Sequence, residues 1–288
     1  MRSLLFVPAD GGSKLAKALA AGADAVILDL EDSITPERKA QARAAALEFL
    51  KAANTNKERP RLLVRINGLD TGMTDADLDA VVAGKPDAIL FPKAEGGASV
   101  THLDAKLTAR EAIAGLPEGA IKILAQSVES AAGLFLAGTF RDASARLIGM
   151  TWGPEDLSAE LGAEANRDAN GDLTEPYRIA RAMCLFSAAA AKLPAIETVY
   201  VDFRNSEGLR RDTLAARRDG FTGRLAIHPA QVAVINEVFT PSPEQIAKAK
   251  AVIAAFAAQP DAGAVGIDGK MYDRPHLLRA QALLARID

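Results

Sequence analysis

The sequence lacks several features that would each indicate a class of protein. It contains one cysteine, Cys184, so neither an intrachain disulfide nor a cysteine zinc cluster can form. No apolar run reaches the ~18 residues that a membrane-spanning helix needs, and the apolar run near the N-terminus is too short for a secretion signal. Basic residues form no block, and the net charge is −3. These absences predict a cytoplasmic protein that acts on neither a membrane nor nucleic acid.

The motifs of several common enzyme classes are also missing. There is no G-x-S-x-G elbow, no Walker loop and no G-x-G-x-x-G after a predicted strand. The three histidines, His102, His228 and His276, do not have the spacing of metal ligands, although His228 follows the last predicted strand and can face a site there. "DANGDLTE" (168–175) resembles a calcium loop, but its glycine comes two residues too early, so we interpret it as an ordinary turn.

The sequence does have a regular alternation of short apolar runs and longer Ala-rich helical patterns. Runs that are apolar on nearly every residue, each separated by a helix, are typical of a parallel sheet buried on both faces. Eight such runs are present, at 3–7, 25–30, 62–66, 88–92, 121–126, 146–150, 198–201 and 224–227. Eight units favour a (β/α)8 TIM barrel over the rival interpretation, a doubly wound open sheet.

The pattern changes after the predicted barrel, which we expect to occupy residues 1–239. "TPSPEQ" forms a Pro-rich break. It is followed by an Ala-rich helix at about 243–258, a Gly-rich loop at about 260–269 and an amphipathic helix from Pro275. We interpret residues 240–288 as a C-terminal helical extension. It has little core of its own, so we expect its apolar face to pack on a neighbouring subunit.

Charged residues follow successive predicted strands. "DAVILDLEDS" (24–33) places Asp29, Glu31 and Asp32 at the end of the second strand. Barrel active sites assemble at the C-terminal strand ends, so these acids are expected at the barrel mouth. The later strands are followed by Arg65, by Lys93 and Glu95, by Gln126 and Glu129, and by Glu155 and Asp156.

Two of these acids, Glu129 and Asp156, follow adjacent strands and can converge on one metal ion. Two carboxylates plus water suit Mg²⁺, although acids in first helical turns are also common, and spacing alone leaves the two interpretations balanced. Arg65 can clamp a substrate carboxylate or pair with Glu31 or Asp32. For Lys93, an ion pair with the surrounding acids is favoured over a Schiff-base role.

Several motifs together carry a family resemblance that spans most of the chain. They are "RSLLFVPA", "DAVILDLEDS", "VRINGLDT", "FPKAEG", "GPEDLSAELG", "GRLAIHPAQVAVINEVFTPSPEQI" and "AVGIDGKMYDRPHLLRA". The chain resembles the citrate lyase β-subunit-like branch of the HpcH/HpaI aldolase superfamily, which also contains malyl-CoA lyases. The resemblance implies a TIM barrel, a homotrimer or hexamer, Mg²⁺ (or Mn²⁺), and a carbon–carbon bond cleaved or formed between a coenzyme A thioester and a 2-oxo acid.

The resemblance also implies roles for individual residues. Glu129 and Asp156 match the metal ligands, and Arg65 matches the catalytic, substrate-binding arginine. Asp273 matches an acid that is delivered across a subunit interface, whereas local sequence alone would equally make it a cap of the helix near Pro275. The predicted substrate-binding set also contains Glu31, Asp32, Lys93, Gly153, Pro154 and Glu155. One departure is "QSVES", where many relatives have Glu-Thr.

The resemblance leaves other functions open. The chain could act on a thioester carried by an acyl carrier protein inside a citrate lyase complex. It could hydrolyse a malyl thioester on the same site, or it could be a regulatory module that has kept the pocket without turnover. The complete set of acids and arginine argues against the last interpretation.

Overall fold

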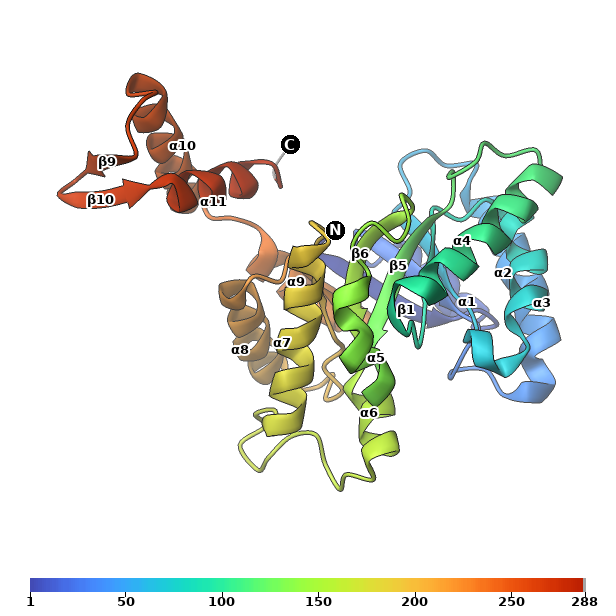
Figure 1. Cartoon of the computed structure of the whole chain (residues 1–288). Coiled ribbons are helices and arrows are strands. Elements are labelled where there is room, and N and C mark those ends of the chain that lie inside the picture. Colours follow the sequence, from blue (N-terminus) through green and yellow to red (C-terminus); the bar gives the residue numbers. More distant parts are fainter. Residues whose placement is uncertain (287–288) are drawn as a thin grey trace. The chain divides into compact units, whose positions relative to one another are not determined.

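A ring of eight parallel strands forms the centre of the computed structural model, which describes residues 1–286 (Figure 1). The strands are β1 Ser3–Pro8, β2 Ala25–Asp29, β3 Arg61–Arg65, β4 Ala88–Phe91, β5 Lys122–Val128, β6 Leu147–Trp152, β7 Ile196–Glu197 and β8 Gly223–Ala226. They pair in the order β6-β5-β4-β3-β2-β1-β8-β7. An isolated parallel bridge between Met150 and Ala195 joins the two end strands. The predicted TIM barrel is therefore confirmed, and the open-sheet alternative is wrong.

The barrel interior is filled by apolar side chains from alternate strand positions. Because side chains alternate along a strand, every second residue points inward. The inward cluster consists of Leu4, Ala25, Ile27, Leu63, Ala88, Leu90, Leu124, Ile196 and Leu225. Burying one of its leucines contributes about 1.5–3 kcal/mol to folding. The same alternation carries the next inward positions, Asp29, Arg65 and Gln126, to the C-terminal mouth of the barrel.

Helices surround the strands of the barrel. They are α1 Ser13–Leu19, α2 Lys39–Ala53, α3 Thr74–Val81, α4 Gly96–Ile113, α5 Ala131–Leu136, α6 Pro154–Leu161, α7 Glu175–Ala190, α8 Ser206–Asp219 and α9 Pro229–Phe239. In α2 the buried residues include Ala42, Ala46 and Leu50, a spacing of four that places them on one helix face. Cys184 lies on the buried face of α7, and burial raises the pKa of its thiol to about 12.

Two predicted elements are wrong. The seventh strand covers Ile196–Glu197, not 198–201, and the backbone carbonyl of Tyr200 accepts a hydrogen bond from the Gln231 side chain (2.8 Å). The expected Gly-rich loop contains a β-hairpin, β9 Ala264–Ile267 and β10 Lys270–Asp273. Its two-residue turn is Asp268-Gly269, both with positive φ, which is a standard sequence signal for a hairpin.

A second compact unit begins at Glu237, whereas the first covers Met1–Asn236. It contains α10 Pro243–Ala258, the β9–β10 hairpin and α11 Arg274–Leu284. Its small core consists of Ala249, Val252, Phe256, Val265 and Ala280. A capping box formed by Ser242 and Gln245 begins α10 within the Pro-rich segment "TPSPEQ".

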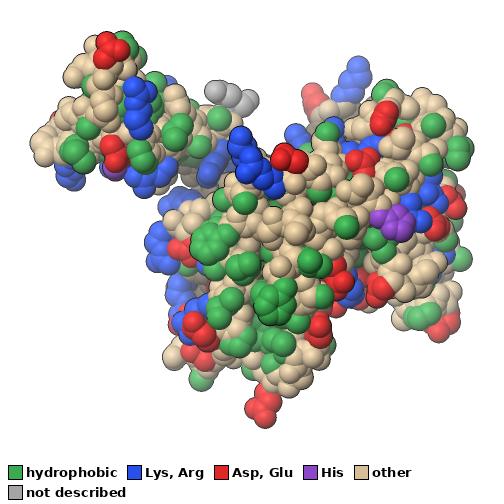
Figure 2. Space-filling view, viewed as in Figure 1, with side chains coloured by type: hydrophobic (Ala, Val, Ile, Leu, Met, Phe, Trp, Pro, Cys, Tyr) green, Lys and Arg blue, Asp and Glu red, His purple; other side chains and the backbone are tan. Residues whose placement is uncertain are grey.

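The surface of the first unit carries a cluster of apolar side chains on three neighbouring helices. Figure 2 shows hydrophobic side chains gathered over α5 and α7, with acidic and basic groups intermixed around them. The exposed large side chains of α5, α6 and α7 are Phe135, Leu136, Leu161, Ile179 and Phe186. An exposed patch of this kind is typical of a protein–protein interface. Within residues 1–286, no helix is long and apolar enough to span a membrane.

Candidate active site

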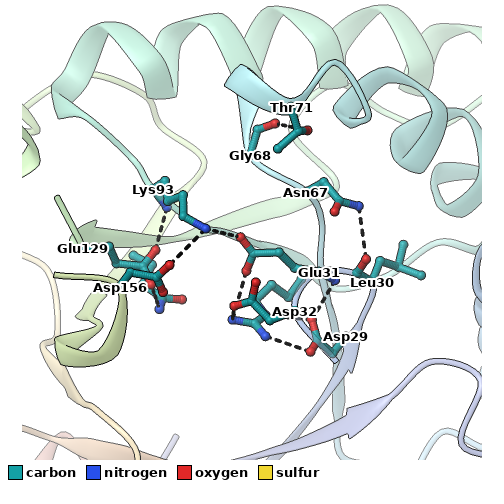
Figure 3. Close-up of polar contacts among 12 residues, drawn as sticks. Asp29, Leu30, Glu31, Asp32, Asn67, Gly68, Thr71, Lys93, Glu129 and Asp156 are labelled. Atoms are coloured by element: carbon teal, nitrogen blue, oxygen red, sulfur yellow. Dashed lines mark hydrogen bonds and ion pairs between the residues drawn. The ribbon is translucent and has the colours of Figure 1, made fainter. Parts of the chain in front are cut away.

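Arg65, at the end of β3, is held by acids from the end of β2 (Figure 3). Its Nε and Nη2 donate to the two carboxylate oxygens of Asp29 at 2.7 and 2.8 Å. Its Nη1 lies 3.0 Å from Glu31 and 3.5 Å from Asp32. The predicted partners Glu31 and Asp32 are therefore present, but the main partner, Asp29, had no predicted role. Burial works against the charge of Arg65, yet these acids raise its pKa, so the guanidinium is a fixed cation.

Lys93 links the acids of three strand ends. Its Nζ lies 2.8 Å from Glu31 and 3.2 Å from Asp156, and its backbone N–H donates to Glu129 at 2.6 Å (Figure 3). Burial opposes the charge, but Glu31 and Asp156 outweigh it and raise the pKa of Lys93. A Schiff base requires a neutral amine. The geometry therefore agrees with the predicted ion pair.

Glu129 and Asp156 lie side by side, at the end of β5 and in the first turn of α6. Glu129 is buried, and this burial, together with the nearby Asp156, raises its pKa well above the usual range. A bound cation would relieve this repulsion. Among the residues that the structure describes, no group of three or more His, Cys, Asp or Glu side chains is arranged to hold a metal ion. Two carboxylates are nevertheless enough for Mg²⁺, which usually keeps several water ligands.

Gly153 leaves the room that the Glu129 carboxylate needs. A Cβ atom at position 153 would collide with Oε1 of Glu129 and approach Nε2 of Gln126 to 2.9 Å. Gln126 Nε2 donates to the same Glu129 oxygen, whereas Gln126 Oε1 is buried and has no hydrogen-bond partner among the residues that the structure describes. The predicted site residues Gly153, Pro154 and Glu155 form the entry to α6 at this point. The donor set and the space around it therefore fit a small, hard cation.

Two cavities meet at these carboxylates. One, of about 440 Å³, is lined by Arg65, Glu129 and Asp156. Its other wall is apolar and had no predicted role; it contains Phe6, Val7, Pro8, Val199, Leu225 and Ile227. The second cavity, of about 500 Å³, is lined by Lys93, Glu95, Glu129, Asp156 and Glu160, among others. A ligand in the first cavity would contact the Arg65 guanidinium, the carboxylates of Glu129 and Asp156, and an apolar surface.

Two polar residues without a predicted role fix the ends of β2 and β3. Lys39 donates through Nζ to the carbonyls of Leu30 (2.6 Å) and Glu31 (2.7 Å) and to Oδ1 of Asn67 (2.7 Å). Asn67 in turn donates to the carbonyl of Leu30 at 3.1 Å (Figure 3). It also donates to the buried Asp77 at 2.6 Å. These contacts hold the chain that carries Glu31 in place. No spacing in the sequence could have indicated these contacts, because they join α2 to residues 65–68, which follow in a different part of the chain.

Two predicted residues have no contact with this group in the hydrogen bonds and ion pairs of the described chain. Asp273, in the second unit, is the N-cap of α11, and its carboxylate pairs with the ring of His276, which lowers the pKa of Asp273. The capping role is thus present, and delivery to a neighbouring subunit stays a prediction. His228 is exposed, stacks on Phe203 with ring centroids 4.7 Å apart, and lines neither cavity.

Comparisons with known proteins agree with this geometry. The family model described as HpcH/HpaI aldolase/citrate lyase matches residues 2–229. The chain is 34% identical to citrate lyase subunit beta of Leuconostoc mesenteroides subsp. cremoris, covering 98% of this chain and 92% of that protein. It is 36% identical to a (3S)-malyl-CoA thioesterase of Cereibacter sphaeroides, covering 100% and 94%. A crystal structure of CitE from Mycobacterium tuberculosis with magnesium, acetoacetate and coenzyme A superimposes with a TM-score of 0.79 at 34% identity, covering 99% and 97%.

Proposed function

Because the chain belongs to the HpcH/HpaI aldolase/citrate lyase family, we propose that it is a Mg²⁺-dependent carbon–carbon lyase. It would cleave or form a 3-hydroxyacyl thioester such as malyl-, citramalyl- or citryl-CoA, from an acyl-CoA and a 2-oxo acid. One observation carries the proposal: a single cavity combines the fixed cation Arg65 with the repelling pair Glu129 and Asp156.

The residues of the site divide the work of this reaction. Glu129 and Asp156 would hold Mg²⁺, or Mn²⁺, which when bound supplies a Lewis acid for the oxygens of the oxo acid. Arg65 is already oriented by Asp29, so it can stabilise the enolate charge on the thioester oxygen without reorganisation. Glu31 and Asp32 keep the guanidinium in place, and Lys93 lowers the repulsion among the acids.

A proton must leave the acyl methyl group during synthesis and return during cleavage. We assign this transfer to Asp273 of a neighbouring subunit, because its place in "GKMYDRPH" matches the acid that, as the family resemblance implies, is delivered across a subunit interface. The apolar patch of α5, α6 and α7 supports assembly into a homotrimer or hexamer. The extension, from about residue 240, would then pack on a neighbour.

Thioester hydrolysis is the second candidate, since one relative is a malyl-CoA thioesterase. A water molecule would then attack the thioester carbon, and the same residues would stabilise the resulting charge. An acyl carrier protein could supply the thioester in place of CoA, as the family resemblance implies for a chain that acts inside a citrate lyase complex.

The reaction is tested by incubating the protein with Mg²⁺ and malyl-, methylmalyl- or citramalyl-CoA. Free CoA, acyl-CoA and oxo acid are assayed separately. Glyoxylate with acetyl-CoA from malyl-CoA indicates cleavage, and free CoA with malate indicates hydrolysis. Glu129→Ala and Asp156→Ala should each abolish Mg²⁺ binding in calorimetry, whereas Glu160→Ala, in the adjoining cavity wall, should keep it. Unchanged Mg²⁺ affinity in the first two variants would contradict the metal assignment.

The role of Asp273 is tested by mixing subunits. Asp273→Asn and Glu129→Ala should each be inactive alone. Co-assembled, they should regain part of the activity, because some interfaces then join an intact metal site to an intact Asp273. Mixed oligomers that stay inactive, or near-normal turnover by Asp273→Asn alone, would show that Asp273 acts only as a helix cap.

A further inference from the structure

One side of the cavity of about 440 Å³ is apolar, and the proposed reaction does not yet use it. This side lies at the ends of strands β1, β7 and β8 and consists of Phe6, Val7, Pro8, Val199, Leu225 and Ile227 (the apolar wall). Leu225 belongs to the inward cluster of the barrel, and Phe6 and Val199 pack against that cluster. The apolar wall therefore continues the barrel core up to the point where it contacts a ligand.

Part of the apolar wall is not covered by the protein. Ile227 is 40% exposed although its side chain is wholly apolar. The ring of Phe6 is half-buried and faces the Arg65 guanidinium, with 4.9 Å between Cζ and the ring centroid. An apolar ligand group that covers these side chains removes them from water, which favours its binding. The apolar wall and Arg65 thus face the same ligand.

The charged groups around this cavity leave a second anionic group of a ligand without a partner. In the described chain, Arg65 is the only basic residue that lines the cavity, whereas the acids that line it are Asp29, Asp32, Glu129, Glu155 and Asp156. The proposed reaction places one substrate carboxylate at the metal site and the thioester oxygen at Arg65. A second carboxylate would lie against apolar side chains or other acids, and burying an unpaired charge is strongly unfavourable.

The 2-oxo acids that such a site could use differ in one group. The oxo carbon carries a hydrogen in glyoxylate, a methyl group in pyruvate and a carboxymethyl group in oxaloacetate. The carboxylate and the oxo oxygen, which all three share, belong at the metal site in the proposed reaction. The variable group is therefore the part that contacts the remaining surface of the cavity, which is the apolar wall.

We propose that the apolar wall selects 2-oxo acids with a short alkyl group, as in pyruvate, and rejects those with a second carboxylate, as in oxaloacetate. The inference rests on the proposed function and narrows it to thioesters of the citramalyl type. The apolar wall lines the same cavity as Glu129 and Asp156. The alkyl group is therefore assigned to the oxo acid held at these residues and not to the acyl group of the thioester.

The test compares cleavage of citramalyl-CoA, malyl-CoA and citryl-CoA, which would release pyruvate, glyoxylate and oxaloacetate. In the wild type, kcat/KM for citramalyl-CoA should exceed that for malyl-CoA about 10- to 200-fold, the range for one alkyl carbon in an apolar pocket. It should exceed that for citryl-CoA at least about 100-fold, because the second carboxylate has no opposite charge. Ile227→Ala should lower the preference for citramalyl-CoA over malyl-CoA about 10-fold. Ile227→Lys adds a cation to the apolar wall, so it should raise kcat/KM for citryl-CoA and lower that for citramalyl-CoA.

Val201→Ala and Val201→Lys are the matched controls, since Val201 is an apolar residue with a similar exposed fraction (54%) that does not line this cavity. Both variants should keep the wild-type order of substrates. Calorimetry of the Mg²⁺-loaded protein with pyruvate and with oxaloacetate makes the same comparison without turnover. Pyruvate should bind the wild type more tightly, and oxaloacetate should gain affinity in Ile227→Lys.

The outcomes separate this inference from the proposed function. A wild type that cleaves citryl-CoA as well as citramalyl-CoA, or unchanged selectivity in both Ile227 variants, would overturn the role of the apolar wall. A change in Ile227→Ala between malyl-CoA and methylmalyl-CoA alone would also overturn it, because the methyl group of methylmalyl-CoA belongs to the acyl part. A protein that binds pyruvate more tightly than oxaloacetate, with the expected gain in Ile227→Lys, but cleaves no thioester would support the apolar wall and overturn the proposed function alone.

Discussion

Two ion networks in the barrel unit use the same residue types but differ in how completely they are satisfied. In the first, Arg146 is buried between Asp104 and Glu111 of α4 and donates to Glu111 (2.8 Å) and to Thr108 (2.7 Å). Glu111 also accepts the backbone N–H groups of Gly119 (2.9 Å) and Ile121 (2.7 Å). Burial opposes the charge of Glu111, but these donors lower its pKa. Each buried charge of this network is therefore stabilised by an opposite charge or by hydrogen bonds.

The second network, at the barrel mouth, is not satisfied in this way. Burial raises the pKa of Glu31 and of Glu129 even though Arg65 and Lys93 are close. The buried Oε1 of Gln126 has no hydrogen-bond partner within residues 1–286, and the buried Oε2 of Glu31 has only its ion pair with Arg65 at 3.0 Å. A sequence selected only for stability would replace such groups. The difference indicates that the Arg146 network stabilises the fold, whereas the mouth retains charges for a ligand.

The largest effect is expected when the satisfied network is broken. Arg146→Ala leaves Glu111 buried without its cation, so the free energy of unfolding should fall by about 3–5 kcal/mol. Urea denaturation measures the change. Lys106→Ala, which removes an exposed ion pair with Asp75 from the same helix, should cost less than about 1 kcal/mol and serves as the control. Similar losses in the two variants would contradict the distinction.

An intermediate effect is expected at the link between the fold and the site. Asp29→Asn removes the main partner of Arg65 but leaves Glu31, so a loss of about 2–4 kcal/mol at pH 7 is expected. Despite burial, Arg65 lowers the pKa of Asp29 in the folded protein. The stabilisation by Asp29 is therefore present above its ordinary pKa of about 3.9 and is lost as the pH falls through the lower folded value.

Denaturation of the wild type and Asp29→Asn between pH 7 and pH 3 checks this prediction. The two stabilities should stay well separated down to about pH 4 and converge only below it. A difference that disappears by pH 6 would mean that Asp29 is not ionised against Arg65.

The smallest effect on stability is expected at Glu31. Burial raises the pKa of Glu31 in the folded protein, so ionisation of Glu31 works against folding as the pH rises from about 4.3 through the folded pKa. Glu31→Gln should therefore change the free energy of unfolding by less than about 1 kcal/mol at pH 7 and gain on the wild type as the pH rises. Turnover should nevertheless fall, because Arg65 and Lys93 lose a shared anchor. If Glu31→Gln lowered the free energy of unfolding as much as Arg146→Ala does, Glu31 would stabilise the fold in the way Arg146 does, and this prediction would be wrong.

The fold could be predicted where hydrophobic pattern alone decides it. Strands β1 to β6 and β8 have mainly apolar central residues, because a parallel sheet is buried on both faces. The seventh strand was misplaced because the buried Glu197 interrupts its apolar run. That carboxylate is satisfied by Trp152 Nε1 (2.6 Å) and Arg181, residues 45 and 16 positions away. Pairings at such distances leave no periodic trace in the sequence.

The same limit applies to the site. Strand ends were predictable, so Glu31, Arg65, Lys93, Glu129 and Asp156 could be expected at one rim. Which acid holds which cation was not predictable, because it depends on side-chain reach across strands, and the pairing of Asp29 with Arg65 was missed for this reason. The apolar cavity wall was missed because its residues look like ordinary strand positions.

The single bridge between Met150 and Ala195 has a consequence for how the barrel moves. Strands β1 and β2 are joined along five residue pairs, whereas β6 and β7 meet at one, where the Met150 N–H donates to Pro194 (3.0 Å). Local opening costs less where fewer hydrogen bonds must break, so the Met150 amide should exchange with deuterium faster than the amides of β2. Gly153, one residue after β6, and Thr198, one residue after β7, both line the cavity of about 440 Å³. The most weakly joined strands of the barrel, β6 and β7, therefore end beside the cavity that Glu129 and Asp156 line. A ligand that contacts the ends of both strands should slow deuterium exchange at the Met150 amide.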